Sequence, residues 1–157
     1  MSKVCYFASN HPLPAKENPS VKMYSINEAI ANGVELDLEF LEEIDRDLPG
    51  VILWAESEDD LEYPAIWEIE PYDEAPKSEM KYFAEVEGDI RKDLPGILAY
   101  IRENLQAGET LELWDVWLGS LSGGQLVEKT CSLDELTEEY LGALFEDGVD
   151  FKLTIQG

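Results

Sequence analysis

The sequence predicts a single α+β domain, residues 1–157, with a mixed or antiparallel sheet and about four helices. Three observations support this class. The length of 157 residues fits one domain, apolar residues follow helical spacing in some segments and strict alternation in others, and capping boxes precede two of the expected helices. We expect residues 1–80 to form an extension of sheet and helix, and residues 81–157 to form a β-α-β-β-α-β unit.

The first part of the chain is expected to hold one strand and two helices. Residues 3–8 are rich in β-forming side chains and predict the strand. Ser25-Ile26-Asn27-Glu28 is a capping box, which opens a short helix that Gly33 can end. A second helix is expected over residues 37–46, where apolar side chains recur at helical spacing and acids occupy the other side. Its apolar stripe consists of Phe40, Leu41, Ile44 and Leu48.

Two more strands are predicted before residue 71. The unbroken apolar run Val51 to Ala55 is typical of a centrally buried strand. Residues 65–70 alternate between two sets of side chains with the period of a strand. Because Pro71 and Pro76 interrupt any further strand, we expect residues 71–79 to form a linker or a long surface loop.

The pattern is most regular after residue 80. Residues 81–87 predict a strand, and residues 93–106 carry the clearest helical spacing in the chain. Pro95 falls in the first turn of that helix, where its missing amide costs little. Residues 110–118 alternate again and predict the next strand.

The C-terminal elements complete the expected unit. Residues 125–131 are expected to return antiparallel to strand 110–118, across a turn at the Gly- and Ser-rich residues 119–124. Ser132-Leu133-Asp134-Glu135 is a second capping box and opens a helix that Gly148 ends. Residues 149–155 alternate as the last strand. The resulting β-α-β-β-α-β order is compatible with a ferredoxin-like sheet.

The charge of the chain excludes several classes of partner. Asp and Glu number 35 against 11 Lys and Arg, which gives a net charge of −24. A nucleic-acid binder needs basic side chains to neutralise phosphates, and anionic membranes attract basic segments, so neither partner is expected. No apolar run is long enough to span a bilayer, and the N-terminus lacks the pattern of a signal peptide. We therefore expect a cytoplasmic protein.

No catalytic or metal-binding motif is present. Cys5 and Cys131 are too far apart for zinc-ribbon or thioredoxin spacing and are interpreted as buried thiols. A nucleophilic pair of Cys5 with His11 is the sharper alternative, but nothing in the sequence brings these two residues together. The acidic run Glu56 to Glu62 lacks the glycine of an EF-hand loop. No catalytic residue, metal or cofactor is assigned, and the protein is expected not to be an enzyme.

The clearest functional signal is the concentration of acidic side chains. Residues 56–79 hold ten acids against a single base, Lys77, and several aromatic residues lie among them. Carboxylates can steer a basic partner while aromatic rings anchor it. The candidate partner-binding residues are Glu56, Glu58, Asp59, Asp60, Glu62, Tyr63, Glu68, Glu70, Tyr72, Asp73 and Glu74.

The function that best fits this signal is an acidic cytoplasmic binding protein that engages a basic protein partner. Some inhibitors of basic enzymes, such as toxin-neutralising immunity proteins, are also acidic and of this size. The analogy is one of charge and size only. Three alternatives stay open. The acids form a surface that only keeps the chain soluble, the chain is a homo-oligomeric structural protein, or it is a small-molecule enzyme without a recognisable motif.

Overall fold

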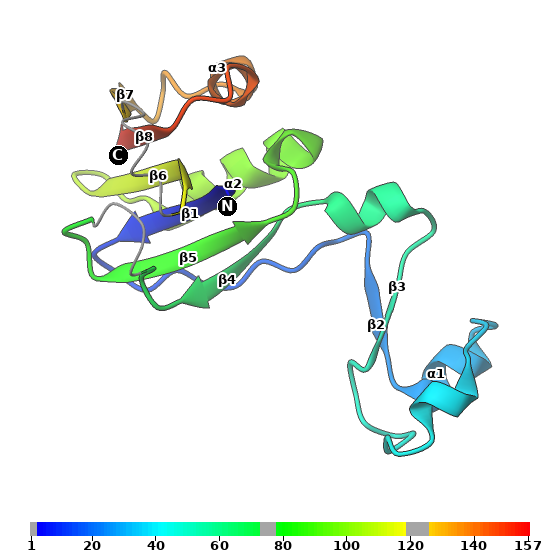
Figure 1. Cartoon of the computed structure of the whole chain (residues 1–157). Coiled ribbons are helices and arrows are strands. Elements are labelled where there is room, and N and C mark those ends of the chain that lie inside the picture. The colour runs from blue at the N-terminus through cyan, green and yellow to red at the C-terminus, as the bar shows by residue number, and fades with distance from the viewer. Residues whose placement is uncertain (1–2, 73–77, 119–125) are drawn as a thin grey trace. The chain divides into compact units, whose positions relative to one another are not determined.

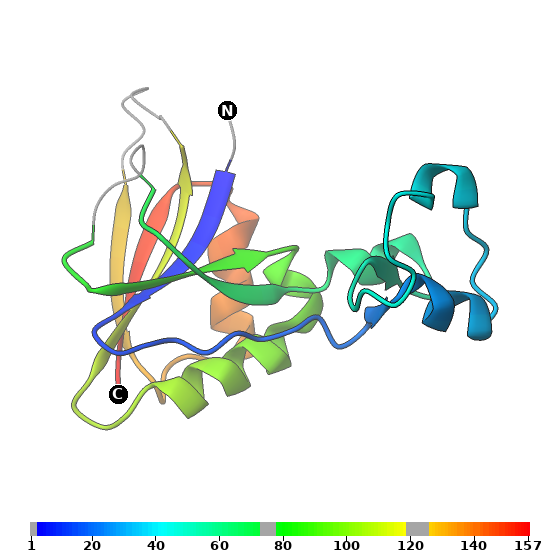
Figure 2. The same ribbon diagram turned by 90° about the horizontal axis from the view of Figure 1, so that it is seen from below.

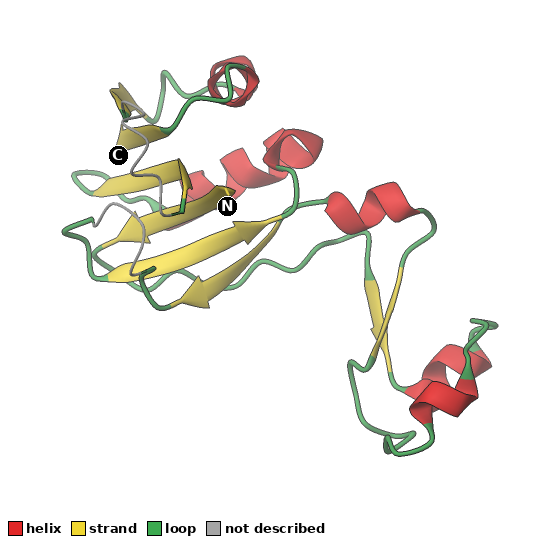
Figure 3. Cartoon of the chain, in the orientation of Figure 1, coloured by secondary structure: helices red, strands yellow, loops and turns green. Residues whose placement is uncertain are grey.

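The computed structural model describes residues 3–72, 78–118 and 126–157 (Figure 1). It confirms the α+β class, with helices and strands in one chain (Figure 3). The described residues contain a mixed six-stranded sheet and three α-helices rather than about four. The chain divides into two compact units. The sheet unit comprises Met1–Glu17 and Pro64–Gly157, and the inserted unit comprises Asn18–Tyr63.

The sheet unit contains the six-stranded sheet, and all six of its strands were predicted within two residues of their bounds. Their order is β4 (Ala65–Ile69), β5 (Tyr82–Glu87), β1 (Lys3–Ser9), β6 (Thr110–Trp117), β8 (Phe151–Gln156) and β7 (Val127–Ser132). Neighbouring strands are antiparallel except β7 and β8, which are parallel. β1 therefore lies inside the sheet, between two strands that follow it by more than 70 residues.

The pairing expected for residues 125–131 is wrong. β7 does not pair with β6, because β1 and β8 occupy the two edges of β6, and β7 instead runs parallel to β8. The turn expected at residues 119–124 lies outside the described residues. The β-α-β-β-α-β order along the chain is present, but a ferredoxin-like sheet is not confirmed, since β1 separates β5 from β6.

Two helices cover one face of this sheet (Figure 2). α2 (Leu94–Asn104) begins after Asp93, whose side chain accepts a hydrogen bond from the Gly96 amide, and Pro95 occupies its first turn as expected. The helices pack apolar side chains onto the sheet in a continuous core. Members of this core include Phe7, Ile66, Ile97, Ile101, Leu113, Leu141, Phe151 and Leu153.

The other covering helix begins later than expected. Ser132 and Glu135 form the hydrogen bonds of a capping box, but they close a turn, and α3 (Glu138–Glu146) begins after Thr137. The Thr137 side chain accepts a hydrogen bond from the Tyr140 amide. Gly148 follows the helix with a φ of 64°, the left-handed conformation that glycine adopts readily, which confirms the predicted helix end.

The opposite face of the sheet carries an aromatic cluster. The rings of Tyr6 and Trp114 are stacked with centroids 5.9 Å apart, and Phe83 lies 6.2 Å from Tyr6. Tyr72 also contacts Tyr6, at 6.0 Å between ring centroids. Both faces of the sheet are thus covered at β6, which explains why residues 111–116 are all buried despite their alternating sequence.

The inserted unit is small and built around a two-stranded ribbon of β2 (Lys22–Tyr24) and β3 (Ile52–Trp54). α1 (Ile26–Ala31) follows β2, and the predicted capping box of Ser25 and Glu28 is formed. Short 3₁₀ turns occur at Leu38–Leu41 and Glu58–Glu62. Within the unit, the Asn18 side chain donates a hydrogen bond of 2.8 Å to the carbonyl of Asp60.

Two expectations for the inserted unit are wrong. The helix expected over residues 37–46 is only a 3₁₀ turn, and Phe40 of its expected stripe is 82% exposed. Isolated helices of this length are marginal without a surface to pack on, so the stripe alone does not hold an α-helix. The strand expected to be centrally buried is a ribbon strand in which Leu53 is 58% exposed.

Candidate functional site

The acidic run proposed from the sequence forms an exposed segment of the inserted unit. Glu58–Glu62 is a 3₁₀ turn, Glu56 precedes it, and the side chains of Glu56, Glu58 and Asp59 are exposed. The whole inserted unit carries thirteen acidic side chains against two basic ones, Lys22 and Arg46, a net charge of −11. Two cations cannot neutralise thirteen carboxylates, so this unit presents a strong negative potential to solvent.

The remaining candidate residues belong to the sheet unit. Glu68 in β4 and Glu70 just after it are exposed. Tyr72 is half-buried against Tyr6, and its hydroxyl hydrogen-bonds to Glu85. Burial and this carboxylate raise the pKa of Tyr72. Asp73 and Glu74 lie outside the described residues.

The inserted unit also exposes an unusual number of large apolar side chains. Its buried apolar residues are few, chiefly Ile26 and Ala29. Seven of the ten large apolar side chains that are exposed in the described residues belong to this unit. They are Met23, Ile30, Leu38, Phe40, Leu48, Leu53 and Leu61.

Sequence reasoning assigned Phe40, Leu48 and Leu53 to cores and did not single out the other four residues. Leu53 fell in the run expected as a buried strand, and Phe40 fell in the stripe of the expected helix. No local pattern could have found them, because the bounds of the inserted unit follow from long-range strand pairing, and a unit of 46 residues is too small to bury most of its apolar side chains by itself.

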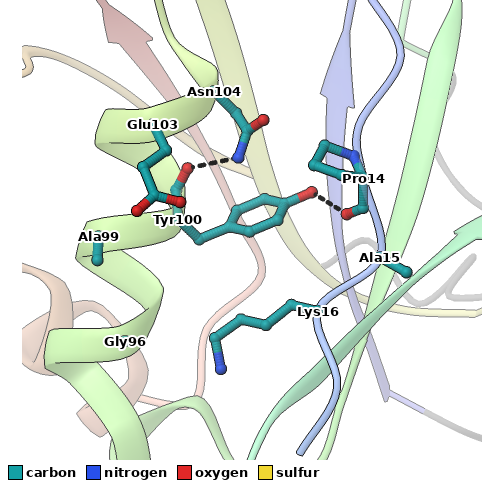
Figure 4. A pocket seen from close by; sticks show the side chains of 8 residues that line it. All are labelled: Pro14, Ala15, Lys16, Gly96, Ala99, Tyr100, Glu103 and Asn104. Atoms are coloured by element: carbon teal, nitrogen blue, oxygen red, sulfur yellow. Dashed lines mark hydrogen bonds between the residues drawn. The ribbon is translucent and has the colours of Figure 1, made fainter.

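A groove of about 290 Å³ lies in the sheet unit, between α2 and the segment Pro14–Lys16 (Figure 4). Its polar groups are largely occupied by the fold. The Tyr100 hydroxyl donates to the carbonyl of Pro14 at 2.8 Å, and the Asn104 side chain donates to the carbonyl of Tyr100 at 2.8 Å. Lys16 Nζ lies 3.3 Å from Asp93 Oδ2. These contacts connect the segment Pro14–Lys16 to α2 and to the residue before it. We assign no ligand to the groove.

The His11 ring makes contacts that connect two parts of the sheet unit. Its Nε2 donates to the carbonyl of Asn104 at 2.6 Å, and its Nδ1 lies 3.1 Å from Ser9 Oγ and 3.3 Å from Glu109 Oε2. Ser9 and Glu109 therefore meet the same ring nitrogen, which is not the relay of a catalytic triad, where the nucleophile and the acid contact opposite nitrogens. The ring joins the loop after β1 to the end of α2.

Neither thiol is activated. Cys5 and Cys131 are free, and burial raises the pKa of both, with Asp115 adding to the rise for Cys5 and Glu135 to that for Cys131. A protonated thiol is a poor nucleophile. In the part of the chain that the structure describes, the His11 ring contacts Ser9, Asn104 and Glu109, so the pair of Cys5 and His11 is not supported.

Two buried acids occur in β6, on opposite faces of the sheet. Glu112 Oε1 accepts hydrogen bonds from Trp114 Nε1, at 3.0 Å, and from the Ser78 hydroxyl, and Lys152 Nζ lies 3.5 Å from Glu112 Oε2. Asp115 pairs with Lys3 at 3.1 Å on the other face, because residues three apart in a strand point to opposite sides. The two carboxyls therefore do not form a common acid-base site.

The described ranges contain no group of three or more His, Cys, Asp or Glu that could hold a metal ion. In the same residues, no helix is both long and apolar enough to cross a membrane. Comparisons with protein-family models, with curated proteins and with solved structures found no match to this chain.

Proposed function

We propose that this protein binds a basic protein partner through the acidic surface of its inserted unit, with the segment Glu56–Glu62 at its centre. The observation that carries the proposal is the net charge of −11 on the 46 residues of Asn18–Tyr63. The sheet unit has the larger core. The inserted unit is one continuous segment of the chain between Glu17 and Pro64.

Opposite potentials would make the encounter fast and dependent on salt. Exposed charges are screened beyond about 8 Å at physiological ionic strength, so the rate of association should fall as salt rises. The two free cysteines fit a reducing compartment, in keeping with a cytoplasmic protein. Inhibition of a basic enzyme is one form that such binding can take.

The candidate residues belong to both units and differ in what each can contribute to binding. Glu68 and Glu70 are exposed on the sheet unit and add to the negative potential there. Tyr72 already packs on Tyr6, so it is a weaker anchor than the sequence suggested. Tyr63 is half-buried at the end of the inserted unit and keeps part of its ring for a partner.

The test is the capture of a partner from the cells that make the protein, at about 50 mM and about 300 mM salt. A variant with Glu58, Asp59, Asp60 and Glu62 all changed to Lys should lose a basic partner that the wild type retains at the lower salt. The matched control changes Glu87, Glu103, Glu146 and Asp147 to Lys, which alters the net charge equally at exposed positions of the sheet unit.

The control variant should keep most of the captured partner. Equal loss in both variants would mean that net charge alone, and not the inserted unit, governs capture. Failure to enrich any basic protein at low salt would refute the proposed function.

A further inference from the structure

The ribbon of the inserted unit has one open apolar face. Met23 of β2 and Leu53 of β3 are directly opposite in the antiparallel register, so their side chains project from the same face. They are 50% and 58% exposed. Residues on the other face are more covered: Tyr24, Ile52 and Trp54 are half-buried, and Lys22 Nζ lies 5.8 Å from the centre of the Trp54 ring.

The exposure of this pair is costly unless something covers it. Opposed apolar side chains on neighbouring strands form a small continuous surface, and such surfaces on charged proteins are typical of binding sites. A two-stranded ribbon is also marginally stable by itself and gains most from a further packing partner. Both facts favour an occupant for the Met23 and Leu53 face.

The charge around the face selects the kind of occupant. The ribbon belongs to a unit of thirteen acids and two bases, and the whole chain carries −24. A second copy would bring the same negative potential to the contact. A polypeptide whose apolar side chains lie between Lys and Arg residues would instead place cations against the surrounding carboxylates.

We propose that the Met23 and Leu53 face docks a basic polypeptide segment through apolar side chains, which become buried between the two, while the surrounding acids hold the cations of that segment. The inference rests on the proposed function and adds to it: the acids provide attraction at a distance, and this pair provides the contact that holds the partner. Affinity should therefore depend on apolar side chains in both molecules.

The experiment uses the full chain and two short synthetic peptides of equal length and charge. In one, Lys alternates with Leu, and in the other, Lys alternates with Ser. Isothermal titration should show tighter binding of the Lys/Leu peptide. The double variant Met23→Ser with Leu53→Ser should weaken that binding by about tenfold, since each buried side chain contributes a severalfold factor. The Lys/Ser peptide should bind both proteins alike.

A matched control changes Tyr82 and Val149 to Ser. These side chains are 36% and 44% exposed on the sheet unit, and their removal should leave both affinities unchanged. Circular dichroism of each variant checks the fold, and because all four side chains are exposed, the spectra should match that of the wild type.

The outcomes separate the two proposals. Equal binding of the two peptides, or a double variant that binds the Lys/Leu peptide as tightly as the wild type, would overturn the docking face but leave the charge-based function standing. Weak binding of both peptides at low salt would overturn the proposed function itself. If sedimentation at high salt shows a dimer that the double variant loses, the face joins copies of this chain, and the inference of a basic occupant is wrong.

Discussion

Asp115 is a buried carboxyl in β6 whose protonation should affect the stability of the fold. Burial raises the pKa of Asp115, although Lys3 lies 3.1 Å away and opposes the rise. The folded state therefore holds the proton of Asp115 more tightly than the unfolded chain does. As the pH falls from neutral through the folded-state pKa, protonation of this group favours folding, and its contribution is lost as the pH rises again.

We expect Asp115→Asn to remove this contribution. The free energy of unfolding of the wild type, measured by urea titration at several pH values, should rise more than that of the variant as the pH is lowered from 7 into the acidic range. General relief of repulsion between acids occurs in both proteins and cancels in the comparison. Parallel pH profiles for the two proteins would contradict the assigned role of Asp115.

Glu112 and Lys152 form the second residue-scale test. Lys152 Nζ lies 3.5 Å from Glu112 and 5.2 Å from the centre of the Trp114 ring. Lys152→Met should lower the free energy of unfolding by about 2 kcal/mol or more, because it leaves a buried carboxylate without its cation. Adding Glu112→Gln should recover part of the loss in a double-mutant cycle. Additive effects of the two changes would show that the pair is not coupled.

These single-residue environments could be predicted from the sequence only in part. The absence of zinc and thioredoxin spacing led correctly to two unpaired cysteines. The partner of Glu112 lies 40 residues away, and its proximity depends on the β6 and β8 register, which no local pattern encodes. The same holds for His11, whose contact with Asn104 spans 93 residues.

At the scale of elements, the start of α3 gives a direct prediction. Thr137→Ala should lower the free energy of unfolding by about 1 kcal/mol, since its side chain accepts a hydrogen bond from the Tyr140 amide. Ser57→Ala is the matched control, because Ser57 occupies the corresponding position before a 3₁₀ turn without a capping hydrogen bond from its side chain. Urea titration of both variants measures the difference. Equal effects would place the start of the helix elsewhere.

Elements with strong periodicity and a surface to pack on were predicted well. Residues 93–106 and 149–155 carried regular apolar patterns and form α2 and β8. Residues 37–46 carried a similar stripe, but the inserted unit offers no adjoining core for it. Without that packing the apolar pattern does not hold an α-helix, and only a 3₁₀ turn forms. β2 has only three residues, too few for an alternating pattern to be recognised. The choice of β8 over β6 as the partner of β7 depends on β1, which arrives from the far end of the chain.

The whole molecule carries enough negative charge for its stability to depend on salt. Repulsion among 35 acids opposes the compact state, and added NaCl screens it. The melting temperature should therefore rise as NaCl increases from low millimolar concentrations. The variant with Lys at 87, 103, 146 and 147 has less repulsion and should show a smaller rise. A melting temperature that falls with salt would indicate that attractive ion pairs dominate instead.

The two units should also differ in local stability. The sheet unit has a continuous core, whereas the inserted unit buries few apolar residues, chiefly Ile26 and Ala29. Amides of β2, β3 and α1 should exchange with solvent faster than those of β1 and β6. Hydrogen exchange followed by mass spectrometry measures this directly. Equal protection in both units would mean that they unfold together.

The sequence predicted the composition of the candidate site but not how its residues are divided in the fold. The density of acids in residues 56–62 is visible in the sequence, and these residues do form an exposed turn. Residues 56–63 belong to the inserted unit, whereas residues 68–72 belong to the sheet unit. This division follows from long-range strand pairing, which places β4 in the sheet beside β5. Acid content alone cannot indicate such a division.

The central position of β1 has a consequence for how the chain folds during synthesis. β1 leaves the ribosome before both of its partners, β5 and β6, so its edges stay unpaired while the inserted unit and the residues up to Tyr82 and Thr110 are made. A strand whose backbone groups are unpaired on both edges is prone to pair with other chains. Repulsion between the acidic segments that emerge behind β1 should keep nascent copies apart, so we expect the charge of Asn18–Tyr63 to protect the chain during synthesis.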